Sequence, residues 1–242
     1  MEMKKILWEK LRRTEFAEAV QAKAIVIIPT GSTEQHGNHL PVNTDANCCF
    51  TIAQRAAQAI DQFPVLILPM IWTGYSPVHM SHPGTITLKY QTFIEVLTQV
   101  AASVYAHGFK KILFLNGHAG NSSVIAGMRS KLAAEEGVSC LGYNYWDLPL
   151  VLDEMKKVSQ TDKGFLGHAS EIETSLQLYL QPELVDKAAA TWVSGVWGDP
   201  SSGTSEKGAS IIDTAVKALI KTLRDYYSGE LENKLEWRKE IL

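Results

Sequence analysis

The sequence predicts an α/β fold, a single domain with a mainly parallel β-sheet covered by helices on both faces. Short runs that are apolar along their whole length alternate with longer helical segments, which is the pattern of βαβ units. Each apolar run ends at glycine, proline or asparagine, as buried strands do where they meet a loop. No linker or repeat interrupts the 242 residues, so we expect residues 1–242 to form one domain.

The elements follow in order along the chain. Strands are expected at residues 24–29, 65–68, 111–115 and 138–143. Helices are expected at residues 8–22, 46–60, 90–107, 121–136, 171–180 and 205–227. Gly108 and Gly137 follow two of these helices directly and suit the C-terminal cap position, where glycine accepts left-handed backbone. The stretch 191–208 is rich in glycine, serine and proline and should form a long ordered loop.

Composition and charge exclude several classes of protein. The net charge of −3 provides no basic field to attract nucleic acid or anionic lipid, so neither is expected as a partner. The three cysteines form no disulfide framework and no CxxC pair, which favours a reducing compartment. No apolar run approaches the roughly 20 residues of a membrane span, and the first residues lack the apolar core of a signal peptide. We therefore expect a cytoplasmic protein.

The loop after the first strand carries a set of potential metal ligands. In parallel sheets, ligands bind where loops leave the carboxyl ends of strands, and residues 30–45 occupy this position. Glu34 and His36 are two residues apart and point the same way on extended backbone. Each acid has an ordinary alternative role: a solvated loop residue for Glu34, and for Asp45 a helix N-terminal acid favoured by the dipole. Together the pattern E-x-H-x8-D favours a divalent cation.

A second loop, "NGHAGN", follows the strand at residues 111–115 and contains His118. Gly117 and Gly120 on either side allow the main chain to approach an ion or substrate closely. The alternative is a histidine that packs at a strand end. Because both loops leave carboxyl ends of strands in one parallel sheet, we expect them to converge on one crevice.

A third segment, "GHASEIETS", opens the helix predicted at residues 171–180. His168 and Glu171 are three residues apart, which places them on one helical face, whereas Glu173 points elsewhere. The alternative is a helix N-terminus that carries acids, with Ser170 and Glu173 as a capping box. His39 and His79 are candidates to orient the ligands through hydrogen bonds.

Five segments together resemble a known family. "GSTEQHGNHLPVNTD", "HPGTITL", "NGHAGN", "GHASEIETS" and "GDPSSGTSEKG" are similar, in order and spacing, to the signature segments of the creatininase (creatinine amidohydrolase) family. The resemblance implies a cytosolic α/β amidohydrolase, often a homohexamer, with two divalent metal ions bridged by a carboxylate and a water. Zinc, manganese and iron all fit such a site. By this resemblance the family's ligands are Glu34, His36, His118 and the bridging Asp45.

One position departs from creatininase proper, which has a Tyr-Glu pair after the histidine of its NGH segment. That glutamate is a metal ligand, whereas this chain has Ala119 and Gly120 there. Other relatives, including pyrimidine-nucleotide formamide deformylases, share the glycine. The natural replacement is Glu171, so one ion is expected at Glu34, Asp45 and His118, and the other at His36, Asp45 and Glu171.

These inferences predict a binuclear metal-dependent hydrolase that acts on a C–N bond of a small amide, cyclic amide or formamide. His168 is expected to shuttle a proton to the leaving nitrogen, because an imidazole titrates near neutral pH. By the family resemblance, Ser76 is expected to contact the substrate. Trp146, in "YNYWD", lines or covers the pocket, with core packing as its alternative.

Two further hypotheses remain open at this point. The first keeps the metals but changes the bond, to hydrolysis of a ring ketone or lactone on a sugar-like substrate. The second is a non-catalytic scaffold stabilised by metal. A scaffold predicts closed coordination, whereas catalysis needs an open position, and the glycines around the ligands favour the open case.

Overall fold

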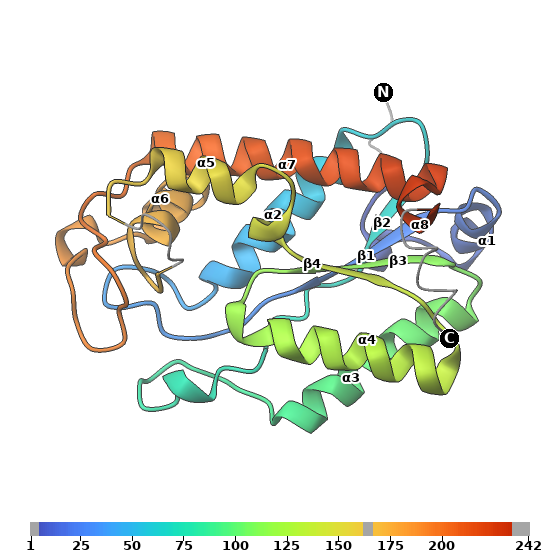
Figure 1. The fold of residues 1–242 in the computed structure, drawn as a ribbon, viewed down its shortest axis with the longest axis horizontal. Helices are drawn as coiled ribbons and strands as arrows, with labels where there is room; N and C mark the ends of the chain where they lie inside the picture. The colour runs from blue at the N-terminus through green and yellow to red at the C-terminus, as the bar shows by residue number, and fades with distance from the viewer. Residues whose placement is uncertain (1–4, 162–166, 234–242) are drawn as a thin grey trace.

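A four-stranded parallel sheet forms the centre of the computed structural model, which describes residues 5–161 and 167–233 (Figure 1). Its strands are β1 (Ile25–Thr30), β2 (Val65–Ile67), β3 (Lys111–Asn116) and β4 (Leu141–Asn144), in the spatial order β2-β1-β3-β4. All three strand pairings are parallel, and β1 pairs with β3 along its whole length, from Ile25 opposite Lys111 to Thr30 opposite Asn116. The predicted fold class is confirmed.

The helices lie close to their predicted positions. They are α1 (Arg13–Gln21), α2 (Thr44–Gln58), α3 (Tyr90–Ala106), α4 (Ser122–Glu136), α5 (Val151–Val158), α6 (Glu171–Leu180), α7 (Ser205–Ser228) and the short α8 (Glu230–Asn233). The expected helix at 8–22 is divided into a 3-10 turn, Trp8–Lys10, and α1. The division follows because Glu15 accepts a hydrogen bond from the backbone N–H of Arg12 and starts a new helix there. Helix α5 was not predicted, because its eight residues are too few to show a clear helical periodicity of apolar side chains.

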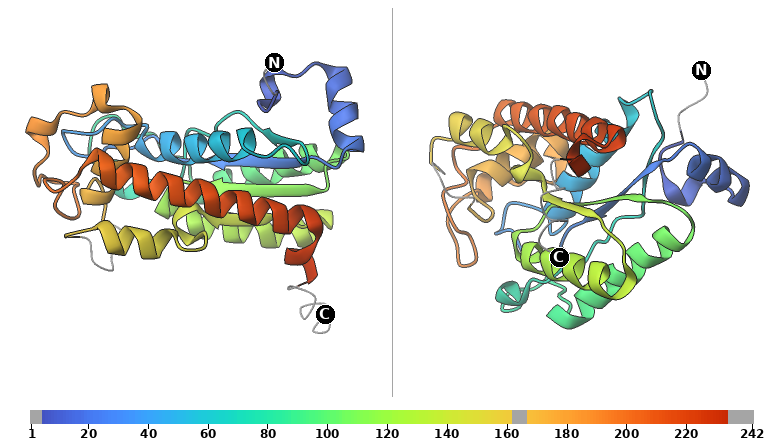
Figure 2. Two further views of the ribbon diagram at one scale, coloured as in Figure 1. Left: turned by 90° about the horizontal axis from the view of Figure 1, so that it is seen from above. Right: turned by 45° about the vertical axis from the view of Figure 1, so that its right-hand side comes forward.

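Alternate residues of β1 face two separate cores. Ile25 and Ile27 pack with side chains of α2 and α7, whereas Val26 and Ile28 pack with side chains of α3 and α4. Figure 2 shows these two helix layers on opposite sides of the sheet. A strand buried on both faces reads as a continuous apolar run, which explains the pattern in the sequence. Among the described residues, no helix is both long and apolar enough to cross a membrane.

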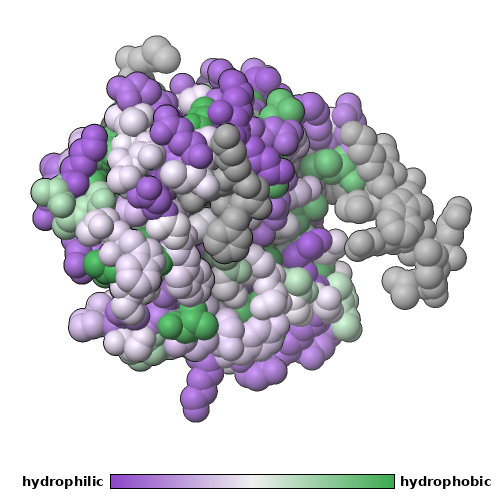
Figure 3. All heavy atoms as spheres, turned by 60° about the vertical axis from the view of Figure 1, so that its left-hand side comes forward, coloured by the Kyte–Doolittle hydropathy of each residue, from purple (hydrophilic) through white to green (hydrophobic). Residues whose placement is uncertain are grey.

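Loops from three strands meet at the carboxyl edge of the sheet. Asn121 joins them, because its side chain donates to the carbonyl of Gly31 after β1 and accepts from the backbone N–H of Tyr75 after β2. His168 and Trp197 exchange backbone hydrogen bonds and bring the chain before α6 to the loop before α7. Figure 3 views the molecule toward this end, where the lower half of the face is largely pale to green. These connections position every candidate site residue at one edge.

Candidate metal centre

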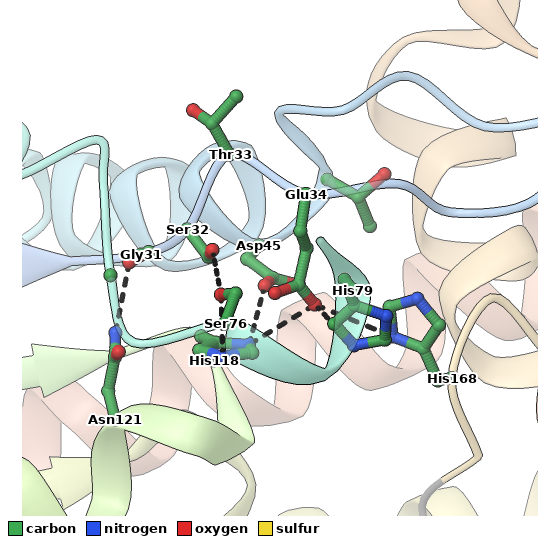
Figure 4. Close-up of polar contacts among 12 residues, drawn as sticks. Gly31, Ser32, Thr33, Glu34, Asp45, Ser76, His79, His118, Asn121 and His168 are labelled. Carbon is green, nitrogen blue, oxygen red and sulfur yellow. Dashed lines mark hydrogen bonds and ion pairs between the residues drawn. The ribbon is translucent and has the colours of Figure 1, made fainter. Parts of the chain in front are cut away.

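The first group of potential ligands consists of Glu34, Asp45 and His118. His118 Nδ1 lies 3.0 Å from Asp45 Oδ2 and 3.3 Å from Glu34 Oε1. All three side chains are buried, and their ligand atoms lie within 4.8 Å of one another. Figure 4 shows the Glu34 carboxylate pointing toward His118, with Asp45 beside it. The two loops therefore converge as the sequence predicted.

The second group shares Asp45 with the first and adds His36 and Glu173. His36 Nε2 lies 3.2 Å from Asp45 Oδ1 and 3.5 Å from Glu173 Oε2. Asp45 thus directs one carboxylate oxygen to each histidine. This is the arrangement that a bridging carboxylate requires.

The hydrogen bonds of the two histidines favour cations between these groups. His118 Nε2 lies 3.1 Å from the carbonyl of Tyr75, and His36 Nδ1 lies 3.1 Å from the carbonyl of Glu34. Because carbonyls only accept, these nitrogens carry the proton in the neutral ring, and the opposite nitrogens present lone pairs to carboxylates.

Several buried atoms of the groups also have no hydrogen-bond partner among the described residues: both oxygens of Glu34, Oδ2 of Asp45 and Nε2 of His36. Buried polar atoms without partners are costly, so this set fits bound divalent cations.

Without metal, protons take the place of the cations. Burial lowers the pKa of His118, but the carboxylates of Asp45 and Glu34 more than offset this and raise it to about 10. His36 behaves alike, since Glu173 and Asp45 raise its pKa well above the usual value despite burial. Burial would raise the pKa of Asp45, yet His36 and His118 hold it below its usual range. The electrostatics of the site therefore demand positive charge.

Contrary to the expectation from the sequence, the structure does not place Glu171 in either group of potential ligands. Its carboxylate points away from both groups and accepts hydrogen bonds from Ser159, the backbone of Gln160, Thr161 and Lys207. Lys207 Nζ lies 2.5 Å from Glu171 Oε1, and the Glu171 side chain is fully buried. Glu171 therefore connects the start of α6 to α7 and to the residues after α5.

Glu173 lies where Glu171 was expected because His168 precedes the helix, and a spacing of three residues places two side chains on one face only when both belong to the helix. Helix α6 begins at Glu171, and Ala169 has a φ of +52°, so His168 does not lie on a helical face with Glu171. Glu173 is the third residue of α6, and its side chain folds back to accept a hydrogen bond 2.5 Å long from Ala169 N. The capping-box pattern, which turns this carboxylate over the helix N-terminus, was the signal that could have found it.

The cavity beside the two groups has a volume of about 450 Å³. His168 lines it, as do Trp146, Trp197, Tyr75 and Val78. Trp146 is therefore in position to contact a substrate. Ser76 is not, because it lies behind His118, with its Oγ 3.1 Å from His118 Nε2 and 2.6 Å from Ser32 Oγ. Ser76 therefore holds the ring of His118 in place, instead of contacting a substrate directly as expected.

His79 and Gln35 contact the ring of His168. His168 Nδ1 lies 3.5 Å from Glu34 Oε1, and burial lowers the pKa of His168, which favours the neutral ring that can accept a proton. His79 stacks on His168, with ring centroids 4.2 Å apart, and burial lowers its pKa to about 4. Gln35, which sequence reasoning missed, contacts both rings. His39 contacts Thr174 instead of a ligand.

Comparison with known proteins decides the family. A family model described as creatininase, creatinine amidohydrolase, matches residues 9–193, which is most of the chain. The chain belongs to the creatininase family. It is therefore a member of a family of hydrolytic enzymes.

Three proteins similar in sequence to this chain are enzymes named for three different substrates. A 3-dehydro-scyllo-inosose hydrolase of Thermotoga maritima is 31% identical over 184 residues, which span 74% of this chain and 58% of that protein. A creatinine amidohydrolase of Pseudomonas putida is 25% identical over 249 residues, covering 87% and 93% of the two chains. A mycofactocin precursor peptide peptidase of Mycobacterium ulcerans is 28% identical over 235 residues, covering 84% and 86%.

Solved creatininase structures share the fold. A creatininase of the Zn-Zn type and a manganese creatininase each superpose with a TM-score of 0.79 at 25% identity, over 92% of this chain and 98% of theirs. These two structures are named for zinc and manganese. Divalent metals in these relatives agree with the buried carboxylates and histidines found here.

The position at which creatininase proper carries its ligand glutamate is closed to any side chain here. A Cβ at Gly120 would overlap the carbonyl of Tyr75 and the ring of His118. A Cβ at Gly117 would likewise overlap the backbone of Asp45. The glycines therefore allow the close backbone approach that the sequence suggested, while the carboxylate of Glu173 lies 3.5 Å from His36 Nε2.

Proposed function

We propose that this creatininase-family chain is a binuclear metal-dependent hydrolase that cleaves a C–N bond of a small amide, cyclic amide or formamide. The observation that carries the proposal is the pair of ligand groups sharing Asp45 beside a cavity of about 450 Å³. Two divalent ions bound there would polarise a carbonyl group and lower the pKa of a water molecule. Zinc, manganese and iron all suit a mixed set of carboxylates and imidazoles.

The residues of the chain take distinct roles in this proposal. Glu34, Asp45 and His118 hold one ion, and His36, Asp45 and Glu173 hold the other. Ser76 and the carbonyl of Tyr75 hold the ring of His118 from behind. His168 moves a proton from the attacking water to the leaving nitrogen, which its cavity position and neutral ring support.

The cavity walls favour a substrate with a flat or apolar body. Trp146, Trp197 and Tyr75 provide ring faces, and Val78 and Ile172 add aliphatic surface. A planar cyclic amide or the apolar portion of a formamide would cover such walls well. The polar end of the substrate would then face the carboxylates and histidines.

Hydrolysis of a sugar-like ring ketone is the second candidate, and the named Thermotoga relative favours it. A polyhydroxylated ring needs hydrogen-bond partners for each hydroxyl, and leaving such groups unpaired costs about 1–3 kcal/mol apiece. The largely apolar and aromatic walls provide few of them. The names of the other two relatives, an amidohydrolase and a peptidase, describe cleavage of C–N bonds.

A substrate panel tests the proposal. Metal-free protein is reconstituted with zinc or manganese and incubated with creatinine, an N-formyl aromatic amine, a short peptide and 3-dehydro-scyllo-inosose. We expect metal-dependent hydrolysis of at least one C–N substrate, abolished by Asp45→Asn. Turnover of the inosose alone would favour the second candidate, and two bound ions without any turnover would favour the scaffold.

The proposal also includes a homohexameric assembly and a cytoplasmic location, as the family resemblance implies. Large apolar side chains at the surface support an assembly, since Trp72, Val78, Met80 and Trp192 are all more than half exposed. Light scattering after gel filtration would measure the mass, and a monomeric mass would refute the assembly.

A further inference from the structure

The side chain of Gln35 lies against two histidines at the edge of the cavity. It is buried, and its Nε2 lies 2.9 Å from His79 Nδ1 and 3.1 Å from His168 Nε2. Figure 4 shows the rings of His79 and His168 side by side, both next to Glu34. The sequence places Gln35 between two ligands, yet none of the roles described above uses it.

The orientation of the Gln35 amide is fixed by two backbone groups. Its Oε1 accepts a hydrogen bond of 2.9 Å from Gly37 N, and its Nε2 donates one of 2.8 Å to the carbonyl of Gly195. Turning the amide over would set oxygen against oxygen at Gly195 and N–H against N–H at Gly37. One N–H of Gln35 therefore remains to point at the histidines.

The tautomers of both rings follow from this geometry. His168 Nε2 lies 2.7 Å from the main-chain carbonyl of Gln35, which only accepts, so this nitrogen carries the proton. It consequently has no lone pair for the Gln35 amide. The free N–H of Gln35 therefore goes to His79 Nδ1, which must be bare, and the proton of the neutral His79 ring lies on Nε2.

We infer that Gln35 is a positioning residue that gives two stacked histidines opposite roles at the metal centre. His79 presents an N–H donor, with its Nε2 3.6 Å from Glu34 Oε1. His168 presents a bare acceptor, with its Nδ1 3.5 Å from the same oxygen. The main-chain carbonyl of Gln35 fixes the tautomer of His168, and the side-chain amide of Gln35 fixes the tautomer of His79.

The chemical consequence rests on the proposed function, whereas the tautomers do not. When water attacks the carbonyl carbon, His168 Nδ1 accepts one water proton while Nε2–H stays bonded to Gln35. The ring then returns that proton to the nitrogen as the C–N bond breaks, leaving a carboxylic acid and an amine. His79 Nε2–H faces Glu34 Oε1 and the cavity, from which it would donate to the substrate carbonyl oxygen.

Nitrogen-15 NMR of histidine side chains tests the inference on the metal-free protein without substrate. The seven histidines are assigned with single-substitution variants, and ring C–H correlations distinguish protonated from bare nitrogens. We expect His79 and His168 both to carry their proton on Nε2. The wild-type spectrum alone can overturn the inference. It would do so if it showed His168 protonated on Nδ1, or His79 without a proton on Nε2.

Gln35→Glu sharpens the test, because it replaces the N–H that faces His79 by an acceptor. We expect the proton of His79 to appear on Nδ1, while His168 stays protonated on Nε2, since the main-chain carbonyl is unchanged. Gln177→Glu is the control: it adds the same charge at a buried glutamine that contacts Asn47 and Cys48 instead of the two rings. An unchanged His79 in Gln35→Glu, or the same change in Gln177→Glu, contradicts the positioning role. Because no turnover is measured, failure of the hydrolase proposal would leave these results intact.

Discussion

Two glutamates at the start of α6 should separate metal binding from stability. Glu173→Gln keeps the shape of the side chain but removes the charge that faces His36. Glu171→Gln removes an identical charge two residues away, where the carboxylate faces Lys207. We expect the first variant to bind one metal ion per chain in place of two, and the second to bind both ions but unfold more easily.

The magnitudes follow from what each carboxylate contacts. The site at His36 would keep two of its three protein ligands in Glu173→Gln, and we expect a loss of about 100-fold in affinity, or about 2.8 kcal/mol. In Glu171→Gln the ammonium of Lys207, with its side chain only 14% exposed, loses its buried partner. Such a break costs about 3 kcal/mol, which lowers the Tm of a chain of this length by about 6–12 °C.

Elemental analysis and thermal unfolding measure the two effects separately. Each variant is stripped of metal, reloaded with zinc, and passed through gel filtration before the zinc content per chain is measured. Unfolding is followed on the metal-free proteins, so bound ions cannot add to stability. Loss of zinc in Glu171→Gln together with full zinc in Glu173→Gln would refute the assignment of Glu173 as the ligand.

Three further predictions concern the same centre. Asp45→Asn should empty both sites, because its two oxygens face different histidines, whereas His36→Ala should empty one; equal losses in elemental analysis would refute the bridge. The raised pKa of His118 stabilises the metal-free fold fully below about pH 6.5, and this stabilisation is lost as the pH rises through about 10. Urea unfolding should show that loss, while zinc affinity rises over the same range, and a flat stability profile would contradict it. Gly120→Ala should displace the His118 ring from the Tyr75 carbonyl and lower zinc content by about one ion; unchanged content would show that the close approach is dispensable.

The fold was accessible from sequence because its physical signals are local. The strand at β1 is apolar at every position since it is buried on both faces, and the glycine after α4 adopts a φ of +63° as the cap position requires. The fourth strand starts at Leu141, three residues later than predicted, because the apolar Val138 and Cys140 belong to the core without joining the ladder.

The site was accessible in part, and the missing part depends on contacts between distant segments. Glu34, His36, Asp45 and His118 lie in two loops that a parallel sheet must bring together, so their convergence could be expected. That Glu173, and not Glu171, lies beside His36 depends on the left-handed backbone at Ala169. Alanine rarely adopts this conformation, so the sequence gives no sign of it. The contacts of Gln35 with His79 and His168 join residues that lie more than 40 positions apart in sequence, and no local pattern encodes them.

Anomalous diffraction at the zinc absorption edge, from crystals of zinc-loaded protein, would locate the metal ions in the proposed binuclear centre. We expect two peaks per chain, one among Glu34, Asp45 and His118 and one among His36, Asp45 and Glu173, with Asp45 contacting both ions. A single peak, or a second ion held without Glu173, would contradict the binuclear centre that we propose.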